Sequence, residues 1–271
     1  MNNILVRSLT GAVFITLVLF PLFWVETSII LMFGLFMTLG LIEFFKFFKS
    51  SSTINIRWEI GLAYGLFLFG IVTGVTLGLL PFVASIVLFP LLFIVFISEL
   101  WRKKENPLLN LSVYALGVLY IVLPFLLMTT FAISYNNEFP LLAGMFLLIW
   151  MNDTFAFLSG KFFGKTKLFE RISPKKTWEG TIGGIVFTLL AAVAITFLFD
   201  DNHLIFWMVS AVIIAPCSIF GDLLESLFKR NMGIKDSGDI LPGHGGVLDR
   251  FDSALLTVPF FSTWTAIYMY F

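Results

Sequence analysis

Residues 180–199 read GTIGGIVFTLLAAVAITFLF, a run without a single charged side chain. A helix needs about 20 apolar residues to cross the hydrocarbon core of a bilayer, and this run has that length. The rest of the 271-residue chain has the same character, because 59% of its residues are hydrophobic and only 13% are charged. Soluble domains are about a quarter charged. The sequence therefore predicts an all-α, polytopic transmembrane protein.

Nine stretches qualify as predicted spans, some of them separated only by short turns. They are residues 8–24, 28–45, 60–79, 82–100, 111–133, 140–160, 180–199, 204–228 and 253–271. The first stretch lacks a small-residue cleavage site after it, so we expect a retained anchor rather than a signal peptide. No soluble domain is visible. We expect one integral unit, with scaffold spans over residues 1–135 and a catalytic region over residues 136–271.

The distribution of charge tests this span count, because short loops on the cytoplasmic side of a membrane carry excess Lys and Arg. If the nine spans alternate from the N-terminus, all 17 basic residues of the chain fall on one side. The loops of the opposite side carry only acidic charges, namely Glu26, Glu138, Asp200 and Asp201. The pattern therefore predicts a cytoplasmic N-terminus and a C-terminus on the far side.

Acidic residues inside the predicted spans of the second half indicate a functional site, because an ionisable group is costly in a bilayer. Asp153 lies in IWMNDTFAF, and Asp222 lies in IFGDLLESLFKR. Four polar residues at i, i+3, i+4 and i+7 share one face of the second helix, which we expect to line a polar cavity: Asp222, Glu225, Ser226 and Lys229. An internal ion pair of Asp222 with Lys229 or Arg230 is the alternative.

The loop before the last predicted span, KDSGDILPGHGGVLDRFD (235–252), gathers charge and glycine. Asp249 and Asp252 are spaced i, i+3 at the start of the last helix. Because Asp222 and Asp249 come from neighbouring spans, we expect both to approach one cytoplasmic cavity. Two carboxylates with room for water and phosphate suit Mg²⁺. Stabilisation of the helix N-terminus is the alternative role of Asp249.

The glycines of this loop, Gly245 and Gly246 among them, allow main-chain N–H groups to approach a ligand closely. His244 is the one histidine of the loop and no cysteine is near it, so a zinc site is not expected.

A second basic cluster is GKTKLFERISPKKTWEG (164–180). Ser173 is predicted to cap a helix with Pro174 at its first position. Lys175 and Lys176 would then lie in the first turn, where the helix dipole disfavours cations unless an anion is bound. The cluster therefore predicts an anion site, with plain cytoplasmic loop charge as the alternative.

The segment SLFKRNMGIKDSGDILPGHGGVLDRFD (226–252) resembles the signature of the phosphatidate cytidylyltransferases, also called CDP-diacylglycerol synthases. That pattern is Ser-x-x-Lys-Arg, four residues, Lys-Asp, then Pro-x-His-Gly-Gly-x-x-Asp-Arg-x-Asp, and this chain fills every fixed position. Residues 152–180 resemble a second region of the family. The first half of the chain matches only as generic hydrophobic spans.

The resemblance implies that CTP and phosphatidic acid give CDP-diacylglycerol and pyrophosphate, with Mg²⁺ on Asp222 and Asp249 and a second, monovalent cation such as K⁺. The implied catalytic residues are Asp222, Asp249, Lys229, Arg230, Asp236 and Asp252. The implied substrate-binding residues are Lys175, Lys176, Ser173, His244, Gly245, Gly246, Arg250 and Asp153.

Two other functions are alternatives. A CTP-dependent lipid kinase of the dolichol or phytol type would release CDP instead of pyrophosphate. A transporter would be supported by an inverted repeat, and none is visible. From the resemblance we also expect a homodimer in the cell (inner) membrane, with the active site facing the cytoplasm and no nucleic-acid partner.

Overall fold

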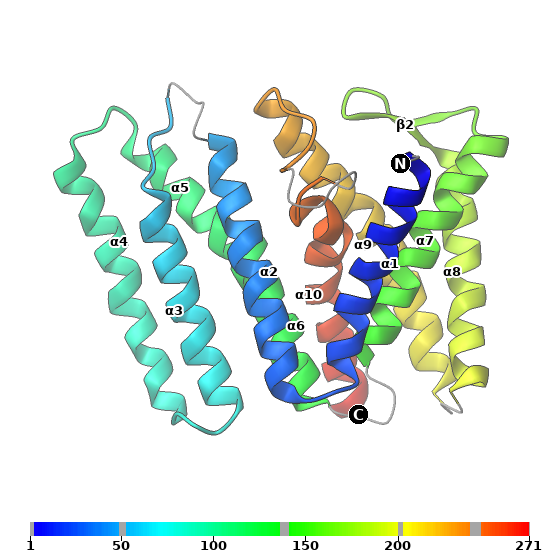
Figure 1. The fold of residues 1–271 in the computed structure, drawn as a ribbon, viewed down its shortest axis with the longest axis horizontal. Coiled ribbons are helices and arrows are strands. Elements are labelled where there is room, and N and C mark those ends of the chain that lie inside the picture. The colour runs from blue at the N-terminus through cyan, green and yellow to red at the C-terminus, as the bar shows by residue number, and fades with distance from the viewer. Residues whose placement is uncertain (1–2, 49–52, 136–140, 200–202, 239–244, 271) are drawn as a thin grey trace. The chain divides into compact units, whose positions relative to one another are not determined.

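The computed structural model describes residues 3–48, 53–135, 141–199, 203–238 and 245–270, with side chains from residue 10 onward (Figure 1). These residues are almost entirely helical, which confirms the predicted all-α class. The chain forms two compact units. Unit 1 is Met1–Tyr135 with Met232–Arg250, and unit 2 is Asn136–Asn231 with Phe251–Phe271.

Unit 1 packs around α2, which contacts α1, α3 and α6. Its elements are α1 (Asn3–Leu22), α2 (Glu26–Phe47), α3 (Trp58–Thr76), the 3-10 helix η2 (Phe82–Val87), α4 (Leu88–Arg102), α5 (Pro107–Gly117), the π-helical segment η3 (Val118–Val122) and α6 (Leu123–Ser134). Large apolar side chains form the core because their burial drives packing. Phe33, Phe44, Ile121 and Phe125 are fully buried.

Unit 2 brings together α7, α8 and α9, which all contact one another. Its elements are α7 (Leu141–Phe163), β1 (Lys167–Phe169), β2 (Ser173–Thr177), α8 (Trp178–Leu198), α9 (Leu204–Asn231) and α10 (Leu248–Tyr270), of which the first turn belongs to unit 1. Helices α7 and α8 approach closely through small residues. A Cβ on Gly183 would lie 2.1 Å from Ser159 Oγ, and one on Gly184 would lie 2.7 Å from Asn152 Oδ1.

Seven helices among the described residues are long and apolar enough to cross a membrane. They are Glu26–Phe47, Trp58–Thr76, Phe82–Arg102, Pro107–Ser134, Leu141–Phe163, Trp178–Leu198 and Leu204–Asn231. The predicted count of nine is therefore not confirmed. The first predicted span corresponds to a shorter apolar helix, Thr10–Leu22, and α10 is not among the seven.

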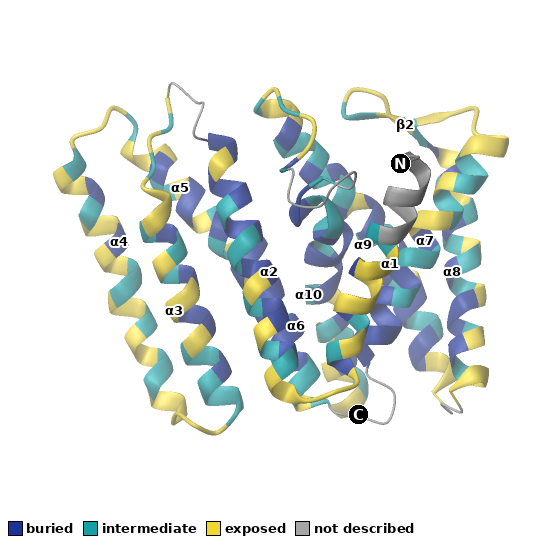
Figure 2. Cartoon of the chain, viewed as in Figure 1, coloured by how far each residue is buried: buried dark blue, intermediate teal, exposed yellow. Residues whose placement is uncertain are grey.

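Many large apolar residues of these helices are exposed, and Figure 2 shows much of α4 coloured as exposed or intermediate. Phe89, Phe93 and Leu100 of α4 are 68%, 58% and 75% exposed. A surface this apolar is what a helix in contact with lipid presents, whereas a water-soluble monomer rarely exposes large contiguous apolar patches. The fold is that of a multi-span membrane protein.

Candidate active site

The helix start predicted at Ser173 is wrong. Strand β2 occupies this segment and pairs with β1, and α8 begins only after Thr177. Thr177 is the N-cap, because its hydroxyl oxygen accepts the N–H of Gly180 at 3.2 Å. The backbone pairing with β1 keeps the residues before the cap extended. Lys175 and Lys176 therefore lie in a strand, and the argument for an anion at a helix start does not hold for them.

The β1–β2 hairpin is fastened to the first turn of α8. The carboxylate of Glu179 accepts the N–H of Lys165 at 3.0 Å and the N–H of Thr166 at 3.1 Å. The N–H of Trp178 also donates to the carbonyl of Thr166 at 2.9 Å. These bonds set the position of the strand that carries the two lysines.

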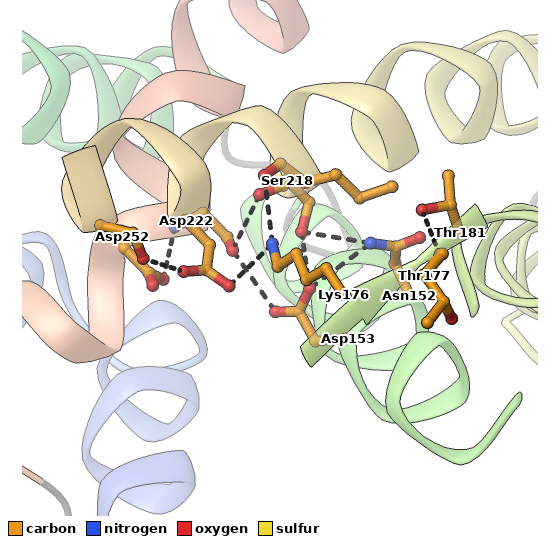
Figure 3. Close-up of polar contacts among 11 residues, drawn as sticks. Asn152, Asp153, Lys176, Thr177, Thr181, Ser218, Asp222 and Asp252 are labelled. Carbon is orange, nitrogen blue, oxygen red and sulfur yellow. Dashed lines mark hydrogen bonds and ion pairs between the residues drawn. The ribbon is translucent and has the colours of Figure 1, made fainter. Parts of the chain in front are cut away.

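The two lysines of β2 have different surroundings, because successive side chains of a strand point to opposite faces. Lys175 is exposed. The ammonium of Lys176 lies 2.8 Å from Oδ2 of Asp222 and donates to the carbonyl of Ile219 at 3.2 Å (Figure 3). Only Lys176 is thus placed at the acidic residue of α9.

The polar face predicted on α9 is present. The hydroxyl of Ser226 donates to Oδ1 of Asp222 at 3.2 Å, and the ammonium of Lys229 lies 3.3 Å from Oε1 of Glu225. Sequence reasoning named Lys229 or Arg230 as the ion-pair partner of Asp222, and it missed Lys176. Nothing in the sequence links Lys176 to Asp222, since the pairing depends on how the hairpin folds back over α9.

Asp153 joins three helices of unit 2. Its Oδ1 accepts the hydroxyl of Ser218 from α9 at 2.8 Å, and its Oδ2 accepts the hydroxyl of Ser253 from α10 at 3.4 Å. The same Ser253 hydroxyl lies 3.2 Å from the carbonyl of Ser218. Asp153 therefore holds α7, α9 and α10 together at the level of the site.

Figure 3 shows three carboxylates gathered near one ammonium: Asp153 and Asp222 lie beside Lys176, and Asp252 lies beside Asp222. Like charges this close need compensating positive charge or a proton on one of the carboxylates. No group of three or more His, Cys, Asp or Glu within the described ranges is arranged to hold a metal by protein ligands alone. Mg²⁺ usually binds only one or two carboxylates and completes its coordination shell with water and phosphate oxygens. Carboxylate oxygens such as these are therefore the type of ligand that Mg²⁺ prefers.

The second predicted metal ligand, Asp249, lies in unit 1 at the end of the signature loop. Its Oδ2 accepts three hydrogen bonds, from Ser237 N at 2.9 Å, from Ser237 Oγ at 2.7 Å and from Gly246 N at 2.8 Å. Gly245 has φ +80°, and a Cβ there would lie 2.4 Å from the same oxygen. The two glycines thus let the loop close on Asp249, and the N–H of Gly246 is donated to this carboxylate.

Sequence reasoning missed Glu43, the residue that holds this loop on α2. Glu43 is only 2% exposed. Its carboxylate accepts the N–H groups of Val247 and Leu248, each at 3.0 Å, and the hydroxyl of Ser237 at 3.4 Å. A Cβ on Gly246 would lie 2.5 Å from Glu43 Oε2, so a larger residue here would displace the Glu43 carboxylate. The signal was an acid within the apolar run GLIEFF, which calls for a partner in a span.

Four candidates from the signature remain. Arg230 and Asp236 are exposed. The Nε of Arg250 is buried without a hydrogen-bond partner among the residues that the structure describes, which suits a group that awaits an anion. His244 falls outside the described residues.

Fold and site together define a polytopic membrane protein with an acidic and basic cluster among its helices. Residues 5–268 match the Cytidylyltransferase family, and the chain belongs to this family.

Individual relatives support the same family. The phosphatidate cytidylyltransferase of Haemophilus influenzae is 41% identical over 176 residues, which are 61% of this chain and 59% of the relative. That of Staphylococcus haemolyticus is 50% identical over 117 residues, 42% of this chain and 44% of the relative. That of Staphylococcus aureus strain COL is 38% identical over 170 residues, 62% of this chain and 64% of the relative. The matched regions thus cover about half of these relatives' length.

Proposed function

We propose that this chain is a phosphatidate cytidylyltransferase, which makes CDP-diacylglycerol from CTP and phosphatidic acid. An oxygen of the lipid phosphate attacks the α-phosphorus of CTP. The bond from that phosphorus to the oxygen bridging to the β-phosphate breaks, and pyrophosphate leaves with the electron pair. The observation that carries the proposal is the complete signature at residues 226–252 in a chain that matches the family over residues 5–268.

The chemistry demands positioning and charge neutralisation more than proton transfer. The lipid phosphate is already ionised near neutral pH, so no strong general base is required, and the attacking and leaving groups must be held in line. We assign phosphate binding to Lys176, with Lys175, Arg230 and Arg250 as further candidates. Lys176 suits this role because its ammonium lies at the site and its present partner, Asp222, is an ion that a phosphate can replace.

Asp222 and Asp249 are the proposed ligands of Mg²⁺, on the resemblance and on their carboxylate chemistry. When bound, Mg²⁺ supplies Lewis-acid stabilisation of charge on phosphoryl oxygens. A second, monovalent cation such as K⁺ is proposed on the resemblance alone. We propose that the three signature elements Lys229, Asp236 and His244 complete the nucleotide site.

On the resemblance, the proposal includes a homodimer in the cell (inner) membrane. The active site is proposed to face the cytoplasm, since all 17 basic residues sort to one side if the nine predicted spans alternate. A C-terminal reporter that is active only in the cytoplasm is expected to stay silent. An active reporter means that the span count is wrong by an odd number.

The decisive experiment supplies the purified full chain with CTP labelled in the α-phosphate and with phosphatidic acid. We expect the label to appear in the lipid fraction and an equal amount of unlabelled pyrophosphate to be released. Labelled CDP in the aqueous fraction instead identifies a lipid kinase. Turnover of neither kind in the presence of Mg²⁺ and K⁺ contradicts the proposal.

A further inference from the structure

Unit 1 contains a cavity that has no part in the proposed reaction. It has a volume of about 650 Å³, and its lining residues lie around the start of α3 and the end of α4; Figure 1 shows these two helix ends at its upper left. Its lining includes three basic side chains and an aromatic one, namely Arg57, Arg102, Lys104 and Trp101. None of the residues assigned to catalysis or substrate binding lines it.

One wall of the cavity is a built hydrogen-bond network. Glu99 is only 4% exposed, and its carboxylate pairs with the guanidinium of Arg102 and accepts the side-chain amide of Asn110 at 3.1 Å. Arg102 in turn donates to the side-chain oxygen of Asn55 at 2.8 Å. Asn110, which is 1% exposed, accepts the N–H of Asn55 at 2.8 Å. Buried polar networks of this kind fix the position of their members.

The network compensates only one of the three basic residues. Glu99 neutralises Arg102, whereas Arg57 and Lys104 form no ion pair among the residues that the structure describes. The backbone of Arg57 is nevertheless fixed, because its N–H donates to the hydroxyl of Tyr114 at 2.8 Å. Two uncompensated cations held at one cavity repel each other, and an anion between them relieves that repulsion.

The location of the cavity indicates the source of the anion. It lies at the ends of two apolar helices, the level at which lipid head groups meet water, and Trp101 beside it is 74% exposed. Tryptophan is enriched at that level, and basic pockets between membrane helices bind phosphate-bearing head groups. Excess basic charge in a loop explains the number of cations, but it does not explain the buried Glu99 and Asn110 that orient one of them.

We propose that this cavity binds the phosphate of an anionic phospholipid, at a site separate from the catalytic one. The test is binding itself, measured without CTP, so it does not depend on the proposed function. Native mass spectrometry of the full chain in detergent counts bound phosphatidylglycerol at increasing lipid concentration, with phosphatidylcholine as the zwitterionic reference.

The variants Arg57→Gln and Lys104→Gln each remove one cation from the cavity. Lys103→Gln is the matched control, since it removes the same charge next to Lys104 from a residue that does not line the cavity. We expect Arg57→Gln and Lys104→Gln each to weaken phosphatidylglycerol binding about 5-fold, the effect of one basic residue near an anionic lipid. Lys103→Gln is expected to leave it unchanged.

Two outcomes overturn the proposal: equal binding of the two lipids by the wild type, or equal weakening by all three variants, which would reflect net charge alone. A competition arm distinguishes the source of the phosphate. Persistence of bound phosphatidylglycerol in excess glycerol 3-phosphate supports a lipid head group. Displacement in the wild type but not in Arg57→Gln assigns the same site to a soluble phosphate and overturns the lipid assignment.

Discussion

Two carboxylates of unit 1, Glu43 and Asp249, and the carboxylate of Asp222 in unit 2 are satisfied by different kinds of partner. In unit 1, Glu43 and Asp249 accept backbone N–H groups and the hydroxyl of Ser237. In unit 2, Asp222 is paired with the ammonium of Lys176 at the end of a flexible stem. In the first arrangement most of the donors are backbone N–H groups, which move only with the main chain. In the second, the donor and the acceptor are both side chains, which can separate by changing rotamer.

This difference assigns separate tasks to the two regions. A backbone donor cannot leave its acceptor without a change in the main chain, so the bonds of Glu43 and Asp249 hold Ser237 and residues 246–248 in place. A lysine can exchange a carboxylate for a phosphate, because both are anionic acceptors of charge-assisted hydrogen bonds. We therefore expect unit 1 to shape the signature loop and unit 2 to exchange partners during turnover.

The largest effect is expected from Asp222→Asn and Asp249→Asn. Each removes a negative ligand at nearly constant volume, and we expect CDP-diacylglycerol formation at saturating Mg²⁺ to fall about 100-fold or more. The comparison predicts a second difference: limited proteolysis of residues 232–250 should accelerate in Asp249→Asn and not in Asp222→Asn. Near-normal turnover in either variant refutes its assignment as a metal ligand.

The two lysines of β2 provide an internal control for each other. Lys176→Gln removes a charge-assisted contact worth about 1.5–3 kcal/mol, so we expect catalytic efficiency to fall roughly 10- to 150-fold. Lys175→Gln is expected to lose much less, because that side chain is exposed and water screens it. Michaelis constants for CTP and for phosphatidic acid identify the substrate that Lys176 contacts. An equal loss of catalytic efficiency in both variants would show that the two lysines have the same role, although their side chains differ in exposure.

Glu43→Gln sharpens the comparison from the side of the loop. The substitution replaces one carboxylate oxygen by an NH₂ group, which cannot accept a hydrogen bond from the backbone of the loop. We expect this to destabilise the loop by about 1–2 kcal/mol. We expect a loss of activity of roughly 5- to 30-fold. A higher Michaelis constant for CTP and faster proteolysis of the loop should accompany it. Recovery of the Michaelis constant in Glu43→Asp would support a role of the charge.

Glu99→Gln is the matched control for Glu43, because Glu99 is an equally buried glutamate of unit 1 in a network without signature residues. It should lower the unfolding temperature and leave the Michaelis constant for CTP unchanged. A similar kinetic change in both variants would mean that Glu43 acts only through the stability of unit 1.

The smallest effect is expected from Glu179→Gln. Glu179 is exposed at its carboxylate and holds the hairpin through two backbone N–H groups, which a glutamine oxygen can still accept. We expect the activity to fall only about 2- to 5-fold, because an exposed contact is screened by water. The same assay at low and high salt checks this, since the difference from wild type should shrink as salt rises. A loss of activity as large as that of Lys176→Gln would contradict the prediction that Glu179→Gln has the smallest effect of these variants.

Several features of the site were predictable because they depend on local pattern. The i, i+3, i+4, i+7 spacing of Asp222, Glu225, Ser226 and Lys229 requires only that the segment be helical, and the structure shows that it is. The start of α8 was not predictable in this way, because Ser173 and Thr177 are both acceptable N-cap residues. The choice fell to Thr177 through the pairing of β2 with β1, a contact that no local rule contains.

The sequence by itself determined that this chain is a helical membrane protein, and it predicts that the chemistry concentrates in the second half. Hydrophobic length and the signature spacing are properties of consecutive residues, so they need no fold. Only the tertiary structure decided that Lys176 is paired with Asp222 and that Glu43 holds the signature loop. These pairs are 46 and about 200 residues apart in the chain, and burying a charge in a span requires a partner without specifying which one.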